Sequence, residues 1–155
     1  MVRGGNRYER DLADPIASSH SSGQVTNSST LVDGLSLAGR VLIAAIFLLS
    51  GVSKVTAPDM TIGYIQSVGL PFPTLGLVVA ILVEVVGGAA LVVGYQTRAV
   101  ASVLALFALV TAFAFHHQLG DQNQFIHFFK NVAIAGGLLE VVAFGAGGWS
   151  LDARR

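Results

Sequence analysis

The chain has 155 residues, of which 53% are hydrophobic and 12% are charged, and its formal net charge is zero. This composition is too apolar for an ordinary soluble domain and lacks the basic surface of a nucleic-acid-binding protein. Because the chain has no cysteine, it can form no disulfide, cysteine-ligated metal site or dithiol relay of its own. An integral membrane protein is therefore expected, with the lipid bilayer as its surroundings and no nucleic-acid partner.

Residues 1–34 are polar and differ in composition from the rest of the chain. Arginine and acidic residues come first, and a stretch rich in Ser, Thr, Asn and Gly follows from Ser18 to Thr30. Such a segment buries too little apolar surface to fold by itself, and it lacks the apolar run of a secretory signal. We therefore predict a disordered cytoplasmic tail.

Four apolar segments follow, each close to the roughly 20 residues that a helix needs to cross the hydrocarbon core. They cover residues 35–53, 75–93, 99–115 and 125–144. Stretches with Pro or Gly, or with mainly polar residues, separate them. The predicted fold class is all-α, an integral membrane bundle of four transmembrane helices over residues 35–152, with a short basic tail at 153–155.

Lys and Arg are unevenly distributed between the two ends of these spans. Seven of the nine fall on the side of the N-terminus, whereas Lys54 and Lys130 lie toward the other side. Positive residues favour cytoplasmic loops, so we predict that both termini are inside. The connection from Thr56 to Thr74 is then external, and it is long enough for a short amphipathic or re-entrant helix containing Tyr64.

Glu84 is the leading candidate for a functional residue, since it is the tenth of the nineteen residues in the second predicted span. A charged side chain at mid-bilayer is costly and therefore indicates a specific role. The nearby Gly87 and Gly88 leave one side of this helix bare, so that a neighbouring helix or a flat ligand can approach. A buried ion pair with a purely structural role is the alternative.

The first predicted span has one polar face. Arg40, Phe47, Gly51 and Lys54 follow one another at spacings of seven, four and three residues, which places them along one side of a helix. Arg40 and Lys54 lie near opposite ends of the span. Each either meets a partner inside the bundle or extends to the lipid headgroups, and the sequence leaves both possibilities open.

The fourth predicted span carries polar residues on two faces. One face holds His127, Lys130 and Asn131, and Glu140 lies on another. Lys130 lies deep enough in the bilayer to need an acidic partner. Matching depths predict two ion pairs. Glu84 pairs with Lys130, although Lys54 competes with Lys130 for this carboxylate, and Arg40 pairs with Glu140.

His116 and His117 lie at the end of the third predicted span. Adjacent residues on a helix point about 100° apart, so at most one of the two faces the bundle. His116 and His127 lie at the same depth, where they would be able to ligate a haem or a metal ion. No further ligand pattern supports this, and we predict neither a metal site nor a haem.

Several motifs occur in order along the chain: Gly39-Arg40-Val41 and Phe47 to Lys54, Gly69-Leu70-Pro71, Glu84 with Gly87-Gly88, Arg98, and Phe129-Lys130-Asn131 with Gly136-Gly137. Together they resemble the DoxX family of small bacterial and archaeal membrane proteins, over residues 35–152. The resemblance implies a four-helix bundle in the cytoplasmic (inner) membrane. It also implies an oxidoreductase subunit connected with quinones or oxidative stress. The positions that match the family pattern are Arg40, Lys54, Glu84, Lys130 and Asn131.

We therefore expect a quinone-linked membrane oxidoreductase component that works with partner subunits. The expected catalytic residues are Glu84, Lys130 and Asn131. The expected quinone-binding residues are Gly87, Gly88, Lys54, Arg40 and His116. The alternatives are an accessory subunit of a larger respiratory or redox complex without its own catalysis, and a carrier of small molecules or protons. Whether the chain is itself an enzyme stays open.

Overall fold

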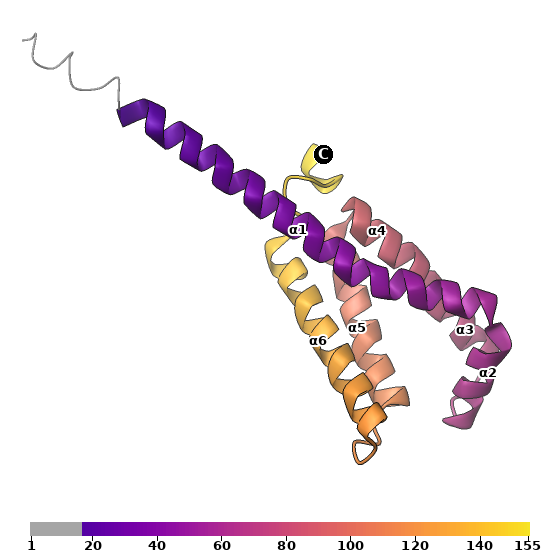
Figure 1. Ribbon diagram of the computed structural model, residues 1–155. Helices are drawn as coiled ribbons and strands as arrows, with labels where there is room; N and C mark the ends of the chain where they lie inside the picture. The colour runs from indigo at the N-terminus through magenta and orange to yellow at the C-terminus, as the bar shows by residue number, and fades with distance from the viewer. Residues whose placement is uncertain (1–16) are drawn as a thin grey trace, which may run out of the picture.

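The computed structural model describes residues 17–155, with side chains from residue 28 onward, and the regular secondary structure of this part of the chain is entirely helical. The elements are α1 (Ala17–Thr56), α2 (Pro58–Ser67), α3 (Pro73–Leu82), a π-helical turn (Val83–Gly87), α4 (Gly88–Val93), α5 (Thr97–Phe115), α6 (Gln122–Phe144) and a 3-10 turn (Asp152–Arg154). Figure 1 shows α5 and α6 side by side, with α1 crossing them and α2 and α3 at its far end.

Four helical segments are long and apolar enough to cross a membrane. They are Ser28–Thr56, Pro73–Val93, Thr97–Phe115 and Gln122–Phe144. They contain the four predicted spans, so the prediction of an all-α chain with four membrane helices is confirmed. The predicted short helix between the first two spans is also present, as α2, and it contains Tyr64.

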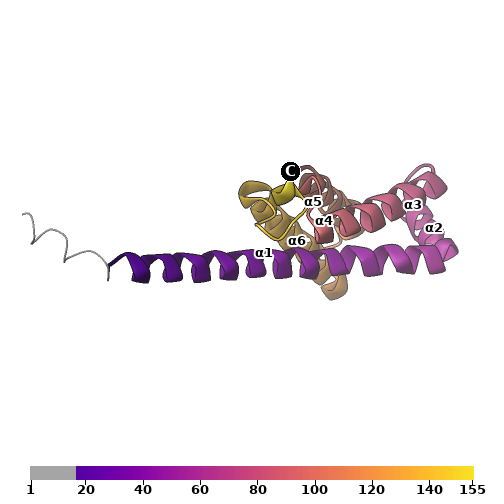
Figure 2. The ribbon, with the colours of Figure 1, turned by 90° about the horizontal axis from the view of Figure 1, so that it is seen from above.

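Helix α1 is longer than predicted. It begins at Ala17, inside the segment predicted to be a disordered tail, and runs straight along one side of the other helices (Figure 2). A helix that has formed extends at little cost, so an apolar span can continue into a polar neighbour. Asp33 also accepts a hydrogen bond from the Gly148 N–H (2.6 Å), and Ser36 donates to the Ala146 carbonyl (2.9 Å). The prediction for residues 1–16 lies outside the described residues.

The core is built largely from alanine and leucine: Ala44, Phe47, Leu91, Ala101, Leu104, Ala105, Ala108, Ala135 and Leu138. Small side chains let helix backbones approach closely, as is typical of helices that pack in lipid. Large apolar side chains point outward instead, and Leu42, Leu49 and Leu106 are 74%, 72% and 64% exposed. This distribution fits a bundle whose outer surface is in contact with lipid.

Arg40 joins three parts of the chain. Its side chain is fully buried and donates to the carbonyls of Leu91 (3.0 Å), Val92 (3.0 Å) and Trp149 (2.7 Å). The predicted ion pair with Glu140 is therefore wrong, since Glu140 is exposed. The end of α4 leaves carbonyls without helical partners, and a buried guanidinium with several donors satisfies them.

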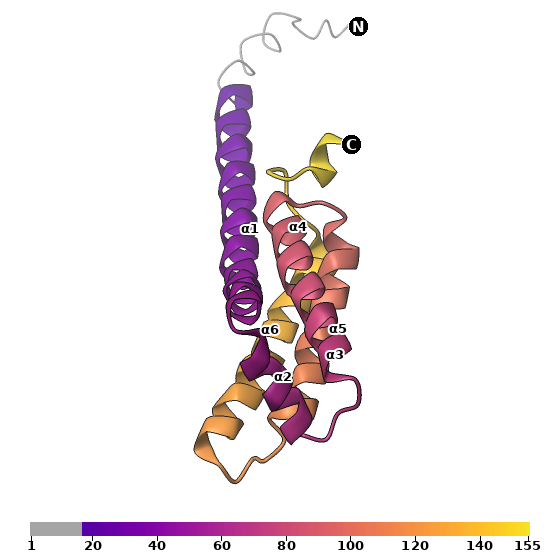
Figure 3. The same ribbon diagram turned by 90° about the vertical axis from the view of Figure 1, so that its right-hand side faces the viewer.

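The segment of residues 145–152 folds back over the end of α4 and is called the C-terminal strap here (Figure 3). The Leu151 N–H donates to the Val93 carbonyl (3.0 Å), and the Asp152 N–H donates to the Gly94 carbonyl (2.9 Å). Together with the bond from Arg40 to Trp149, these contacts fix the strap to the turn between the second and third spans.

Candidate functional site

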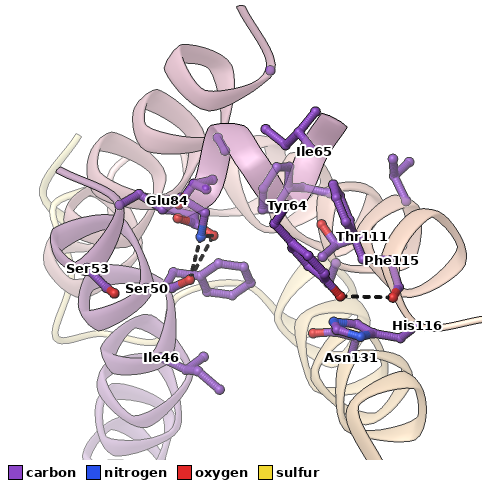
Figure 4. Close-up of a pocket in the computed structure, with 18 of the residues that line it drawn as sticks. Ile46, Ser50, Ser53, Tyr64, Ile65, Glu84, Thr111, Phe115, His116 and Asn131 are labelled. Carbon is purple, nitrogen blue, oxygen red and sulfur yellow. Dashed lines mark hydrogen bonds and ion pairs between the residues drawn. The ribbon is translucent and has the colours of Figure 1, made fainter. Parts of the chain in front are cut away.

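The clearest polar contact inside the bundle joins Lys54 and Glu84. Their Nζ and Oε1 atoms lie 2.9 Å apart, and the Glu84 side chain is 5% exposed and the Lys54 side chain 20%. Ser50 completes the group, because its Oγ accepts from Lys54 Nζ (2.8 Å) and donates to Glu84 Oε1 (3.1 Å). Figure 4 shows Ser50 of α1 and Glu84 of the second span pointing toward each other. A charge at this depth is thus paired and hydrogen-bonded, as burial requires.

Local structure brings these residues together. Ser50 and Lys54 are four residues apart on α1 and so share a face. Between them Gly51 packs against the second span so closely that an added Cβ would lie 2.6 Å from Val85 Cγ2. Glu84 lies in the π-helical turn, a local widening of the helix that occurs frequently at functional sites.

A cavity of about 740 Å³ lies beside the ion pair. It is bounded by α1, α2 and α3 on one side and by α5 and α6 on the other. Most of its wall is apolar and includes Phe47, Ile65, Ala80, Phe107, Ala108 and Ile134. Its polar residues include Ser50, Lys54, Glu84, Thr111, His116, Lys130 and Asn131. The volume of this cavity and the residues that line it are typical of a binding site for a small organic molecule.

The cavity begins where α1 and α6 separate. At Gly137 a side chain would contact Ile43 (3.3 Å from an added Cβ to Cδ1), so the two helices nearly touch at this level. About one turn further along, Ile46 of α1 and Ile134 of α6 both line the cavity. The contact between Gly137 and Ile43 therefore lies next to one end of the cavity.

Helix α2 covers another side of the cavity. Tyr64 donates a hydrogen bond from Oη to the Phe115 carbonyl at the end of α5 (3.2 Å). Its ring also stacks on that of Phe115, with ring centroids 5.3 Å apart. Figure 4 shows Tyr64 reaching across to Phe115 and lying beside His116 and Asn131. Tyr64 thus connects the α2 side of the cavity to the α5 side.

The structure gives Lys130 a different partner from the predicted one. Lys130 Nζ donates to His127 Nδ1 (2.9 Å), one turn earlier on α6, and not to Glu84. Both Lys130 and Glu84 line the cavity, so the prediction placed them at the same site but paired them wrongly. Lys54 pairs with Glu84 because α1 contacts the π-helical turn directly at Gly51, whereas Lys130 lies across the cavity.

His116 and His127 lie together, as their common depth suggested. Their rings stack with centroids 5.1 Å apart, and His116 Nδ1 lies 2.9 Å from Gln124 Oε1. Within the described part of the chain, no group of three or more potential ligands is arranged to hold a metal ion. His116 lines the cavity, so that its α5 side carries a second polar group in addition to the Thr111 hydroxyl.

Three predicted ligand-binding residues do not line the cavity. An added Cβ at Gly87 would lie 3.0 Å from Leu104, and one at Gly88 would lie 3.0 Å from Leu48. The bare side of this helix is thus filled by neighbouring helices and not by a flat ligand. Arg40 binds backbone carbonyls at the C-terminal strap.

The structure adds site residues that the sequence did not single out. Ser50 bonds to both members of the ion pair, and Thr111 contributes a hydroxyl to the cavity. The spacing of four residues between Ser50 and Lys54 was a signal in the sequence. No comparable pattern pointed to Thr111, because its place depends on how α5 packs.

The fold and the site define a class: a four-helix integral membrane protein with a buried ion pair beside an intramembrane cavity. Within that class the chain belongs to the DoxX family, whose model matches residues 35–117. The match includes Lys54, Glu84 and His116, whereas Lys130 and Asn131 lie beyond it.

Two relatives from Escherichia coli K12 extend the match. The chain is 36% identical to the inner membrane protein YphA over 125 residues, which cover 77% of this chain and 89% of the relative. It is 37% identical to the inner membrane protein YqjF over 116 residues, which cover 75% and 88%. No solved structure matches significantly. The relatives and the four membrane helices indicate a multi-pass protein of the inner membrane.

Proposed function

We propose that this protein binds a lipophilic quinone in the cavity and acts as the quinone-linked component of a membrane oxidoreductase, together with partner subunits. The observation that carries the proposal is the position of the Lys54–Glu84 ion pair on the wall of a mostly apolar cavity among membrane helices. Apolar walls suit an aromatic ring, and a few convergent polar groups fix its orientation.

The residues present fit such a ligand. Glu84 lines the cavity, and its Oε2 is buried without a hydrogen-bond partner among the described residues, so an unused polar atom lies in the cavity wall. Lys54 and Asn131 supply donors on different walls. A bound quinone supplies the electron-carrying chemistry, and these side chains bind it, orient it and keep bulk water out. Electrons come from a partner subunit or from a reduced substrate.

The proposal includes an orientation with both termini in the cytoplasm. Its support is the excess of Lys and Arg on the side of the termini. Reporter fusions at the C-terminus test it: fluorescent protein should be active there and alkaline phosphatase inactive. The reverse pattern would overturn the orientation.

Ligand binding is tested by extracting the protein with its surrounding lipid into polymer-bounded nanodiscs and measuring the quinones that accompany it by mass spectrometry. Quinone should be enriched over the bulk lipid with the wild-type protein. Thr111→Phe, which narrows the cavity from the α5 side, should lower the enrichment. Val103→Phe is the matched control, because Val103 lies on the same helix, is exposed and does not line the cavity. Equal quinone content in all samples and in bulk lipid would contradict the proposal.

The redox role is tested separately in membranes. Glu84→Gln should lower quinone-dependent turnover, because the buried carboxylate of the ion pair is lost. Asp59→Asn is the control, since Asp59 is exposed on α2 and does not line the cavity. Unchanged turnover in Glu84→Gln membranes would count against the role.

A second candidate function is that of an accessory subunit without its own catalysis. The observation that favours it is Glu140, which is exposed near the end of α6 and forms no ion pair among the described side chains. A carboxylate on the outer face of a membrane helix calls for a polar partner. Stoichiometric co-purification of other subunits, with their chemistry intact when this protein is absent, would support this function over the first.

A further inference from the structure

The two oxygens of the Glu84 carboxylate differ in their contacts. Oε1 accepts from Lys54 Nζ (2.9 Å) and from Ser50 Oγ (3.1 Å). Oε2 is buried and has no hydrogen-bond partner among the described residues. Glu84 itself lines the cavity, so a small rotation of its carboxylate presents Oε2 to a ligand there. Because a buried acceptor without a donor is unfavourable, a ligand that donates to this oxygen gains binding energy.

None of the neighbouring donors reaches Oε2. Lys54 Nζ donates to Ser50 Oγ as well as to Glu84 Oε1, and the Ser50 hydroxyl donates to the same Oε1. On the α6 side of the cavity, Lys130 Nζ donates to His127 Nδ1. No described side chain therefore supplies Oε2, and the missing donor is one that a ligand in the cavity can bring.

The chemistry of the ion pair fixes what kind of group fits. A carboxylate paired with an ammonium only accepts hydrogen bonds. A quinone carbonyl is also only an acceptor, so it gains nothing at Oε2, whereas the hydroxyl of a phenol or hydroquinone donates to it. The surrounding wall is apolar and accommodates the aromatic ring.

We propose that the cavity selects an aromatic alcohol, the hydroxylated and reduced form of a quinone-type ligand, through a hydrogen bond from its O–H to Glu84 Oε2. This inference rests on the proposed function, because it assigns a chemical form to the ligand of the same cavity. It makes Glu84 the residue that distinguishes the reduced ligand from the oxidised one.

The test measures equilibrium binding of three probes to the full-length protein in lipid nanodiscs without oxygen, with empty nanodiscs to correct for partitioning into lipid. The probes are durohydroquinone, duroquinone and the dimethyl ether of durohydroquinone, which share one ring and differ in hydrogen-bond donors. Durohydroquinone should bind about tenfold or more tightly than either of the others, the usual effect of a hydrogen bond to a charged group.

Two variants assign the preference to Glu84. Glu84→Gln should reduce it to less than about threefold, because the amide brings donors of its own that a quinone carbonyl can accept. Glu140→Gln, which removes the exposed carboxylate of α6, should leave the preference unchanged. If Glu84→Gln does not fold, the probe series on the wild-type protein still decides.

The outcomes separate this inference from the proposed function. Equal binding of all three probes, or tighter binding of duroquinone, would overturn the inference while leaving a ligand-binding cavity. A preference that survives in Glu84→Gln would overturn the assignment to Oε2. Binding of no probe above empty nanodiscs would contradict the proposed function and the inference together.

Discussion

Lys54 of α1 and Glu84 of the second span form an ion pair of 2.9 Å across the interface that Gly51 brings into contact. The pair compensates the charge of a carboxylate that would otherwise lie unpaired inside the membrane. It also places two charged groups at the wall of the cavity, where they can serve packing and ligand binding at once.

Removing one member of this pair should be more harmful than removing both. Lys54→Met leaves the Glu84 carboxylate buried with Ser50 as its sole donor, and should cost about 3 kcal/mol of stability. Adding Glu84→Met should recover most of the loss, because no unpaired charge remains. Thermal unfolding of the four proteins of this mutant cycle in nanodiscs measures the coupling. Additive losses would show that the two side chains do not interact.

Arg40 should tolerate no substitution, not even by lysine. An ammonium has no planar fork with which to reach the carbonyls of Leu91, Val92 and Trp149 together, so Arg40→Lys should cost about 2 kcal/mol. The C-terminal strap should also become more sensitive to proteases. Arg98→Lys, at an exposed arginine, should change stability by less than about 0.5 kcal/mol. Equal melting temperatures for both variants would refute this role of Arg40.

Tyr64→Phe should make the cavity more accessible. The variant keeps the stacking on Phe115 but loses the hydrogen bond from Oη, so α2 should open about two- to tenfold more often. The chain has no natural cysteine, so Ala80→Cys places one thiol in the cavity wall, and its rate of maleimide labelling measures opening. Leu119→Cys, exposed in the loop between α5 and α6, is the control and should react equally in both backgrounds. The same labelling rate of Ala80→Cys with and without Tyr64→Phe would contradict the role of the tyrosine.

The attachment of the C-terminal strap should depend on pH. The backbone N–H groups of Thr97 (2.7 Å) and Gln96 (2.8 Å) donate to the Asp152 carboxylate and lower its pKa. A carboxyl group with a lowered folded-state pKa stabilises the protein fully above its unfolded pKa of about 3.9 and loses that contribution as pH falls toward the folded value.

Comparison with Asp152→Asn isolates this contribution. The wild-type protein should be the more stable near neutral pH, and its advantage should shrink as pH falls below about 4. Melting temperatures of both proteins across this range measure the difference, and other carboxyl groups titrate equally in the two. A difference that stays constant with pH would refute the role of the Asp152 charge.

The sequence by itself determined the four membrane helices and pointed to Glu84. Both follow from one local rule, that a span needs about 20 apolar residues, so a charge in its middle stands out without knowledge of any neighbour. The family motifs were equally visible in the order of residues. The start of α1 was not, because polar residues at its N-terminus continue a helix that the apolar span establishes.

The tertiary structure alone decided which groups meet. Depth in the bilayer favoured Lys130 as the partner of Glu84, with Lys54 as a competitor, whereas the packing at Gly51 selected Lys54. Arg40 likewise binds backbone carbonyls, including one in the C-terminal strap, and not the carboxylate of Glu140. The cavity also exists only because residues from α1, α2, α3, α5 and α6 surround one space. Such pairings depend on the rotation of each helix and the distance between helices, which hydropathy and spacing along one helix do not encode.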